Sequence, residues 1–300
     1  MSLYVYHSNP AAVAPDQNRV LQGLAREDLF TVVHERFMTD TAKYADIVLP
    51  ATTSLEHSDL YRAYGHYTVQ RAYAVIPPVG QSKSNWEVFS LLADAMNMDK
   101  PFFNQSAEDL INSILAKPSS WLASTKIETL FKGKPLELPL PDGYKTQFKT
   151  PSGKIEILNP KEEEPLPKYS KPHGDNAEFW LVNSPDVRLL NSSFNEREDL
   201  TKTNKMLLQM NPEDASQIGL KDNQLVIAYN ERGEVRFKLK ITTKVPKGVV
   251  VTEGVWWLEN TPGNRSVNTL TSQRLTDKGK GSTFYDVKVN VKKCYEINFL

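Results

Sequence analysis

A short polar loop in the first part of the chain carries side chains that suit a nucleotide. Thr39, Asp40 and Thr41 supply two hydroxyls and a carboxylate with little bulk, which can meet a sugar, a base or a phosphate. The apolar run Ile47–Leu49 follows and predicts a buried strand of the parallel type, and Pro50 ends it because proline cannot donate to a ladder. The same residues also suit an ordinary helix-capping loop, so both interpretations stay open.

A second loop, at Ser8 and Asn9, follows the first predicted strand. Asn9 offers an amide to a phosphate or base and Ser8 offers a hydroxyl; alternatively, Asn9 only shapes the turn before Pro10. Strands and one helix alternate through this region, at residues 3–6, 16–25 (the helix), 29–33 and 47–49. This alternation predicts an α/β region with a partly parallel sheet, whose ligands lie at the carboxyl ends of the strands.

The next hundred residues predict a core helix and a hairpin. Ser84 and Glu87 form a capping box before an apolar helical face that runs from Trp86 to Met96. A second helix is predicted at residues 107–115. A turn at residues 150–153 is predicted to join strands at its two flanks, residues 146–148 and 154–158.

The second half of the chain predicts a mainly β domain. Asn211 caps a short helix, with Pro212 in its first position and Gly219 as its stop. Apolar residues alternate at Leu225, Ile227 and Tyr229 within residues 224–229 and again along residues 234–242, and the two runs read as a hairpin. Further strands are predicted at residues 179–183, 248–252 and 285–291. This order of elements suggests a closed barrel, after a charged and proline-rich linker at residues 160–169.

Composition excludes several classes of function. The 300 residues carry 36 basic and 36 acidic side chains. The resulting net charge of +0 argues against binding of nucleic acid or a membrane through an extended positive surface. No apolar run reaches the length of a membrane span. Cys294, the single cysteine, cannot form an internal disulfide or a cysteine-ligated iron–sulfur cluster, and the 5 histidines show no paired metal-binding spacing.

With its flanks, the first loop closely resembles a signature of the molybdopterin oxidoreductases, the family of formate dehydrogenases, nitrate reductases and dimethyl sulfoxide reductases. The signature covers Glu35–Phe37, Thr39–Ala42 and Ala45–Ala51 in this sequence. The later strings Met210–Asn223 and Gly281–Tyr285 resemble parts of the family's molybdopterin-dinucleotide-binding domain. Residues 150–156 and 268–271 resemble further landmarks, so the resemblance spans nearly the whole chain.

The resemblance implies a fold and a cofactor. We expect an α/β molybdopterin oxidoreductase region at residues 1–165, followed by a double-psi β-barrel at residues 176–300. The cofactor would be molybdopterin guanine dinucleotide with molybdenum or tungsten. The resemblance implies no catalytic and no metal-ligating residue in this chain. Ten residues are implied as cofactor-binding: Ser8, Asn9, Glu35, Thr39, Asp40, Thr41, Asn183, Arg188, Asn268 and Tyr285.

The resemblance further implies that this is the carboxy-terminal part of a longer enzyme. The missing amino-terminal regions would carry the metal ligand and, in many relatives, a 4Fe-4S cluster. The chain alone is therefore expected to be apo and inactive, and the full protein to be cytoplasmic unless the missing part holds an export signal. Expected partners are those missing regions, a small-molecule substrate and an electron-transfer partner, without nucleic acid or a membrane span. Two alternatives remain: a non-catalytic barrel module, and a nucleotide-dependent α/β transferase.

Overall fold

The computed structural model describes residues 1–62, 64–98, 100–117, 127–140, 142–174, 176–202 and 206–295. They form two compact units: one combines residues 1–49 with 171–300, and the other comprises residues 50–170. These units differ from the linear division predicted above, at residues 1–165 and 176–300. The reason is that the first 49 residues hydrogen-bond to the barrel region across sequence separations of 214 to 256 residues.

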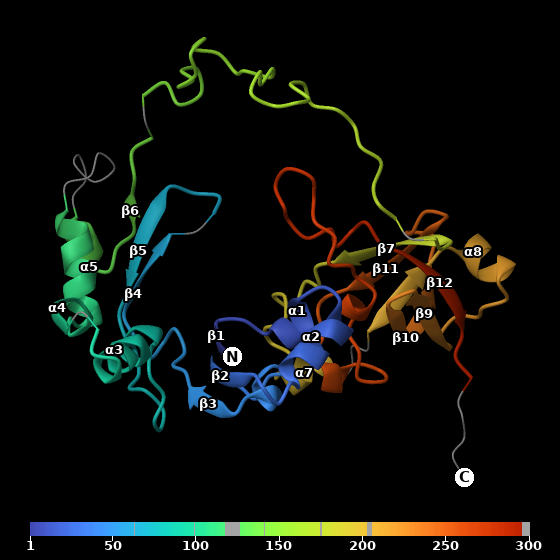
Figure 1. Ribbon diagram of the computed structural model, residues 1–300, viewed down its shortest axis with the longest axis horizontal. Helices are drawn as coiled ribbons and strands as arrows, with labels where there is room; N and C mark the ends of the chain where they lie inside the picture. The colour runs from blue at the N-terminus through green and yellow to red at the C-terminus, as the bar shows by residue number, and fades with distance from the viewer. Residues whose placement is uncertain are drawn as a thin grey trace. The chain divides into compact units, whose positions relative to one another are not determined.

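The amino-terminal part of the first unit is a small α/β layer (Figure 1). Its elements are β1 (Ser2–Tyr6), α1 (Pro10–Val13), α2 (Gln17–Leu24), β2 (Phe30–Glu35), the 3-10 helix η1 (Ala42–Tyr44) and β3 (Ile47–Pro50). The strand order is β1-β2-β3, and β1 runs parallel to β2 with Tyr4 opposite Val32. The predicted parallel sheet is confirmed for this pair, so the loops after β1 and β2 leave the same edge.

β3 forms where the sequence predicted a strand, but the prediction that it is buried is wrong. Ile47 is 44% exposed and Val48 is 37% exposed. β3 lies at the edge of a three-stranded sheet. An apolar run indicates a strand, but it does not say whether that strand is central or at an edge.

The rest of the first unit contains a closed barrel, drawn from yellow to red in Figure 1. Its strands in the described part of the chain are β7 (Phe179–Ser184), β8 (Leu207–Met210), β9 (Leu225–Asn230), β10 (Gly233–Ile241), β11 (Val249–Glu253) and β12 (Lys288–Lys293). They close in the order β10-β8-β11-β7-β12-β9. The β7–β11 and β8–β10 pairs are parallel, and the other pairs are antiparallel. The predicted barrel is confirmed.

Short helices connect the strands of the barrel. They are α7 (Glu198–Thr201), α8 (Pro212–Gln217), η2 (Leu258–Asn260) and η3 (Val267–Thr269). Asn211 caps α8 as predicted, by accepting a hydrogen bond from the Glu213 amide, and Gly219 follows with a φ of +69°. The last strand begins later than predicted, because the Asp286 amide donates to the Thr283 carbonyl (3.1 Å) in a turn before it.

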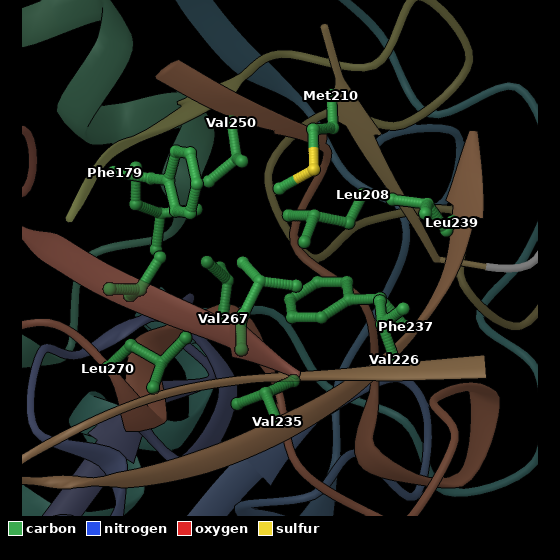
Figure 2. Packing of buried hydrophobic residues seen from close by; sticks show 14 of the residues in the cluster. Phe179, Leu208, Met210, Val226, Val235, Phe237, Leu239, Val250, Val267 and Leu270 are labelled. Carbon is green, nitrogen blue, oxygen red and sulfur yellow. The ribbon is translucent and has the colours of Figure 1, made fainter. Parts of the chain in front are cut away.

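The barrel interior is filled by apolar side chains, ten of which are labelled in Figure 2. Phe237, Leu208 and Met210 are fully buried there. On β9 the buried residues are Val226 and Ala228, although the sequence singled out the alternate set that begins with Leu225. Both sets in β9 are apolar, and the inward one is decided by the antiparallel register, which places Val226 opposite Phe237.

The second unit is built around a small antiparallel sheet. Its elements are β4 (Asp59–Arg62), β5 (Thr68–Ala72), α3 (Asn85–Ala95), α4 (Lys100–Phe103), α5 (Ala107–Ala116), α6 (Glu128–Phe131) and β6 (Leu136–Glu137). The predicted capping box of α3 is confirmed. The prediction of a core helix is wrong: α3 buries only Ala93, and Met96 is 62% exposed. Its Trp86 ring packs on Phe102 and Phe103.

The predicted hairpin around residues 150–153 does not form in the described residues. The turn itself exists, because the Gly153 amide donates to the Thr150 carbonyl (3.0 Å). Its flank contains Ile155, which is 70% exposed, and it pairs with no strand. Ile157 and Leu158 in the same flank are exposed as well, so the turn has no packed partner, and a turn alone does not make a stable hairpin.

Residues 160–169 are exposed and contain neither helix nor strand. Across the described ranges, no helix is both long and apolar enough to span a membrane.

Candidate functional site

A cavity of about 200 Å³ lies in the first unit and gathers three of the predicted site residues, Asn183, Asn268 and Tyr285. Its walls come from Val13 of α1 and from three segments of the barrel domain, residues 183–191, 254–255 and 268–285. The cavity is smaller than the roughly 300–1,000 Å³ of a pocket for a drug-sized ligand. It therefore has room for one ring system rather than for a whole dinucleotide.

Two parallel strands bring the walls together. β7 and β11 pair with Asn183 opposite Thr252, so both strands end at this cavity. Gly254 turns the chain there with a φ of +76°, and a Cβ atom at this position would lie 3.2 Å from the Asp186 Cβ. The positive φ and the close approach at Gly254 both favour a residue without a side chain.

Asn183 presents an unused hydrogen-bond acceptor. Its Oδ1 is buried and has no hydrogen-bond partner within the described ranges, and the same holds for Thr252 Oγ1 on the neighbouring strand. A buried acceptor without a partner costs about 1–3 kcal/mol. Such an acceptor is satisfied by an N–H donor, which the rings of guanine and of a pterin both carry.

Asn268 and Tyr285 contribute differently. The Asn268 amide nitrogen donates to the Ala12 carbonyl (2.9 Å), and its Oδ1 lies 3.3 Å from the Thr271 hydroxyl. Asn268 is 2% exposed, so its side chain holds the wall in place. Tyr285 is 60% exposed and offers an aromatic face.

The loop residues after β1 and β2 form a separate buried cluster. Asn9 Oδ1 accepts from the Thr41 amide (3.1 Å) and the Thr41 hydroxyl (2.7 Å), and Thr41 Oγ1 also accepts from the Ala11 amide (3.0 Å). Thr39 Oγ1 accepts from the Ala42 amide (3.3 Å). These three side chains hold the loops in shape, and they do not line the cavity.

Asp40 links this cluster to the barrel domain. Its two carboxylate oxygens lie 3.1 and 3.2 Å from the Leu258 amide nitrogen, which donates to them. Burial raises the pKa of the Asp40 carboxyl, and the hydrogen bond from Leu258 opposes that shift only partly. Ser8 is exposed, and Glu35 accepts a hydrogen bond from the Arg36 amide (2.8 Å).

Arg188 lines a second, larger cavity of about 1100 Å³. Its guanidinium forms two hydrogen bonds with the Asp186 carboxylate, of 3.0 and 2.8 Å. These bonds hold the pKa of Asp186 below its ordinary value. Asp186 lines both cavities, so the two lie next to each other.

Sequence reasoning missed several residues of the site. Gln17 is fully buried between α1 and η3, and Gly254 and Asn191 line the small cavity. Gly254 lies two residues after the predicted strand 248–252 and was the one sequence signal available, whereas nothing local marks Gln17. In the described part of the chain, no group of three or more His, Cys, Asp or Glu side chains could hold a metal ion.

Comparisons with known proteins agree with this architecture. Residues 1–95 match the molybdopterin oxidoreductase family model, and residues 179–288 match the molybdopterin dinucleotide-binding domain. The probable oxidoreductase YoaE of Bacillus subtilis is 41% identical, over 97% of this chain and 44% of its own length. The dimethyl sulfoxide/trimethylamine N-oxide reductase of Rhodobacter capsulatus is 26% identical, over 85% of this chain and 35% of its own length.

A solved structure has the same fold. Acetylene hydratase from Pelobacter acetylenicus superposes with a TM-score of 0.81 at 21% identity, over 98% of this chain and 44% of that one. At this identity the likeness shows the fold alone.

Residues 179–288, which contain most of the closed barrel, match a dinucleotide-binding domain, and this match defines the class of the module. The chain belongs to the molybdopterin oxidoreductase family, and residues 179–288 are its molybdopterin dinucleotide-binding domain. The cofactor of this family is molybdopterin guanine dinucleotide, which carries molybdenum or tungsten. The chain spans less than half the length of the relatives described above.

Proposed function

We propose that this chain supplies the dinucleotide-binding walls of a molybdenum- or tungsten-dependent oxidoreductase, and that the small cavity takes one ring system of the cofactor. The unpartnered Oδ1 of Asn183 carries the proposal. When bound, the cofactor supplies two-electron redox chemistry at its metal, and the protein supplies binding and orientation.

The side chains around the cavity have distinct parts in this proposal. Asn183 accepts an N–H of the ring, and Tyr285 covers the ring face from the mouth. Asn268 keeps the opposite wall in place through Ala12. Arg188 lines the adjoining larger cavity, into which the pyrophosphate extends because the small cavity holds one ring. Two of its N–H groups bond to Asp186, and the remaining ones donate to the pyrophosphate.

The loops after β1 and β2 hold the remaining part of the dinucleotide in this proposal. Ser8 is exposed and offers its hydroxyl directly, and Glu35 ends β2 at the same sheet edge. Asn9 and the residues Thr39–Thr41 act through the backbone that they fix, because their side-chain oxygens bond within the chain. We further propose that the barrel is of the double-psi type, which its two parallel strand pairs support.

For the complete enzyme, we propose a small-molecule substrate and an electron-transfer partner. The names of relatives support this, since they include reductases of dimethyl sulfoxide and nitrate and a formate dehydrogenase.

The test is calorimetric titration of the 300-residue chain with molybdopterin guanine dinucleotide. We expect Asn183→Leu to bind about 5- to 150-fold more weakly, which corresponds to about 1–3 kcal/mol. The apo variant should be no less stable, because leucine removes a buried acceptor that has no partner. Asn104→Leu, at an exposed residue of the second unit, is the matched control. Equal affinity of Asn183→Leu and the native chain would refute the role of Asn183, and equal binding of plain GMP would favour a mononucleotide-dependent protein.

A further inference from the structure

We propose that Gln17 is a positioning residue for the small cavity: it locks the loop that carries Asn268 against the amino-terminal layer. This inference rests on the proposed function, because it concerns the ligand of the same cavity. Gln17 itself does not line the cavity, and it acts through residues that do.

The Gln17 carboxamide is saturated with hydrogen bonds. Its Nε2 donates to the Ala11 carbonyl (2.6 Å) and to the Ser266 hydroxyl (3.0 Å). Its Oε1 accepts from the Ser266 amide (3.0 Å) and from the Thr269 hydroxyl (2.9 Å). A carboxamide has two donor hydrogens and two acceptor lone pairs, and here all four are used at 0% exposure. Such a group tolerates only one orientation of the loop.

The bonds of Gln17 fix both sides of one wall. On one side they hold α1, which supplies Val13 to the cavity. On the other side they hold η3, which supplies Asn268. The Asn268 amide then donates to the carbonyl of Ala12, the neighbour of Ala11 in α1. Buried hydrogen bonds therefore join the α1–α2 segment to the η3 loop at two points, although the two segments lie about 250 residues apart in sequence.

The hydrogen bonds of Gln17 also reach the nucleotide loops. Ala11, whose carbonyl accepts from Gln17, donates its amide to Thr41 Oγ1 (3.0 Å). Thr41 in turn holds Asn9. A shift of Gln17 thus moves the cavity wall and the loops after β1 and β2 together, which makes it a shared anchor for both ends of a dinucleotide.

Gln17→Glu provides the test, with molybdopterin guanine dinucleotide as the probe and the 300-residue chain as the protein. A protonated glutamic acid keeps the shape of glutamine, one of its donors and its acceptors. A glutamate has no donor, so the Ala11 carbonyl loses its hydrogen bond and is repelled by the negative charge. The hydrogen-bond partners of Gln17 include no titratable group. Burial raises the pKa of a carboxyl above its ordinary value of about 4.3, so affinities are compared at about pH 5 and pH 8.

We expect Gln17→Glu to bind within a few-fold of the native chain at the lower pH and about 5- to 150-fold more weakly at the higher pH. Gln22→Glu is the matched control, because Gln22 is exposed on the same helix, and its affinity should follow the native chain at both pH values. Thr269→Val removes a single bond to Gln17 and should weaken binding at both pH values, in a chain that remains folded.

Three results would overturn the inference. A native chain that does not bind the probe would refute the proposed function and this inference with it. A native chain that binds while Gln17→Glu shows the same relative affinity at both pH values would refute the inference alone. A lower melting temperature of Thr269→Val with unchanged affinity would show that the hydrogen bonds of Gln17 contribute to stability only.

Discussion

Alanine variants of the two glycines at the ends of β11 can separate the cost of a strained backbone from the cost of crowding a side chain against the cavity wall. Gly248 precedes the strand with a φ of +75°, and Gly254 follows it with a φ of +76°. The left-handed conformation costs an alanine at either position about 1–2 kcal/mol of stability. A Cβ at Gly248 has no atom within 4 Å, whereas one at Gly254 lies 3.2 Å from Asp186 Cβ and 3.4 Å from Leu189 Cδ1.

The two variants should therefore differ by the crowding at Gly254. Asp186 cannot easily move away, because two hydrogen bonds tie it to Arg188, and overpacking of this kind costs about 1–3 kcal/mol. We expect Gly248→Ala to destabilise the chain by about 1–2 kcal/mol and Gly254→Ala by about 2–5 kcal/mol. For a unit of this size, each kcal/mol lowers the melting temperature by roughly 2–4 °C.

The assay combines thermal unfolding with calorimetric titration of molybdopterin guanine dinucleotide. Gly254→Ala should also weaken binding, since its methyl group displaces the wall that Asp186 and Leu189 form, while Gly248→Ala should bind like the native chain. Equal destabilisation by the two variants would show that the contacts at Gly254 are not tight. Equal affinities would show that this wall is not part of the ligand site.

Three further predictions concern stability. Burial raises the pKa of Asp40, so its contribution to stability is fully present below the ordinary Asp pKa of about 3.9 and is lost as the pH rises through the raised pKa; relative to Asp40→Asn, the native chain should lose melting temperature as the pH rises above about 4, and parallel curves would contradict this. The Arg71 side chain is 3% exposed, lies against two aromatic rings and bonds to Glu108. Glu108→Gln leaves this buried cation without its counter-ion and should cost about 1–3 kcal/mol in urea unfolding, whereas Arg71→Met removes the cation and should cost less. The reverse order would show that the buried cation is stable without Glu108. Ser106→Ala should remove the capping box of α5 at a cost of about 1 kcal/mol, measured by the same urea titration, and no change would mean that the cap is dispensable.

The sequence by itself determined most of the elements. The caps at Ser84 and Asn211 and the stop at Gly219 lie where local hydrogen bonding and backbone freedom require them. The hairpin of β9 and β10 follows from alternation and a polar turn. These rules involve residues within a few positions of one another, so a linear reading captures them. The family signature added the cofactor, which composition and periodicity do not contain.

Register and exposure were decided only by the tertiary structure. β9 has apolar residues on both faces, and pairing with β10 chose Val226 for the interior. β3 and α3 look like core elements in sequence, yet Ile47 and Met96 are exposed. An apolar pattern shows that a face can be buried, but neighbours distant in sequence decide whether it is covered.

The candidate site depends most strongly on the tertiary structure. The family resemblance pointed to Asn183 and Asn268. It did not show that Asn183 Oδ1 has no hydrogen-bond partner in the described part of the chain or that the Asn268 amide is held by the Ala12 carbonyl. Gln17 looked like an ordinary residue at a helix start. Its four hydrogen bonds join α1 to a loop about 250 residues away. No local rule links such positions, because the partners meet only when the amino-terminal layer packs against the barrel domain.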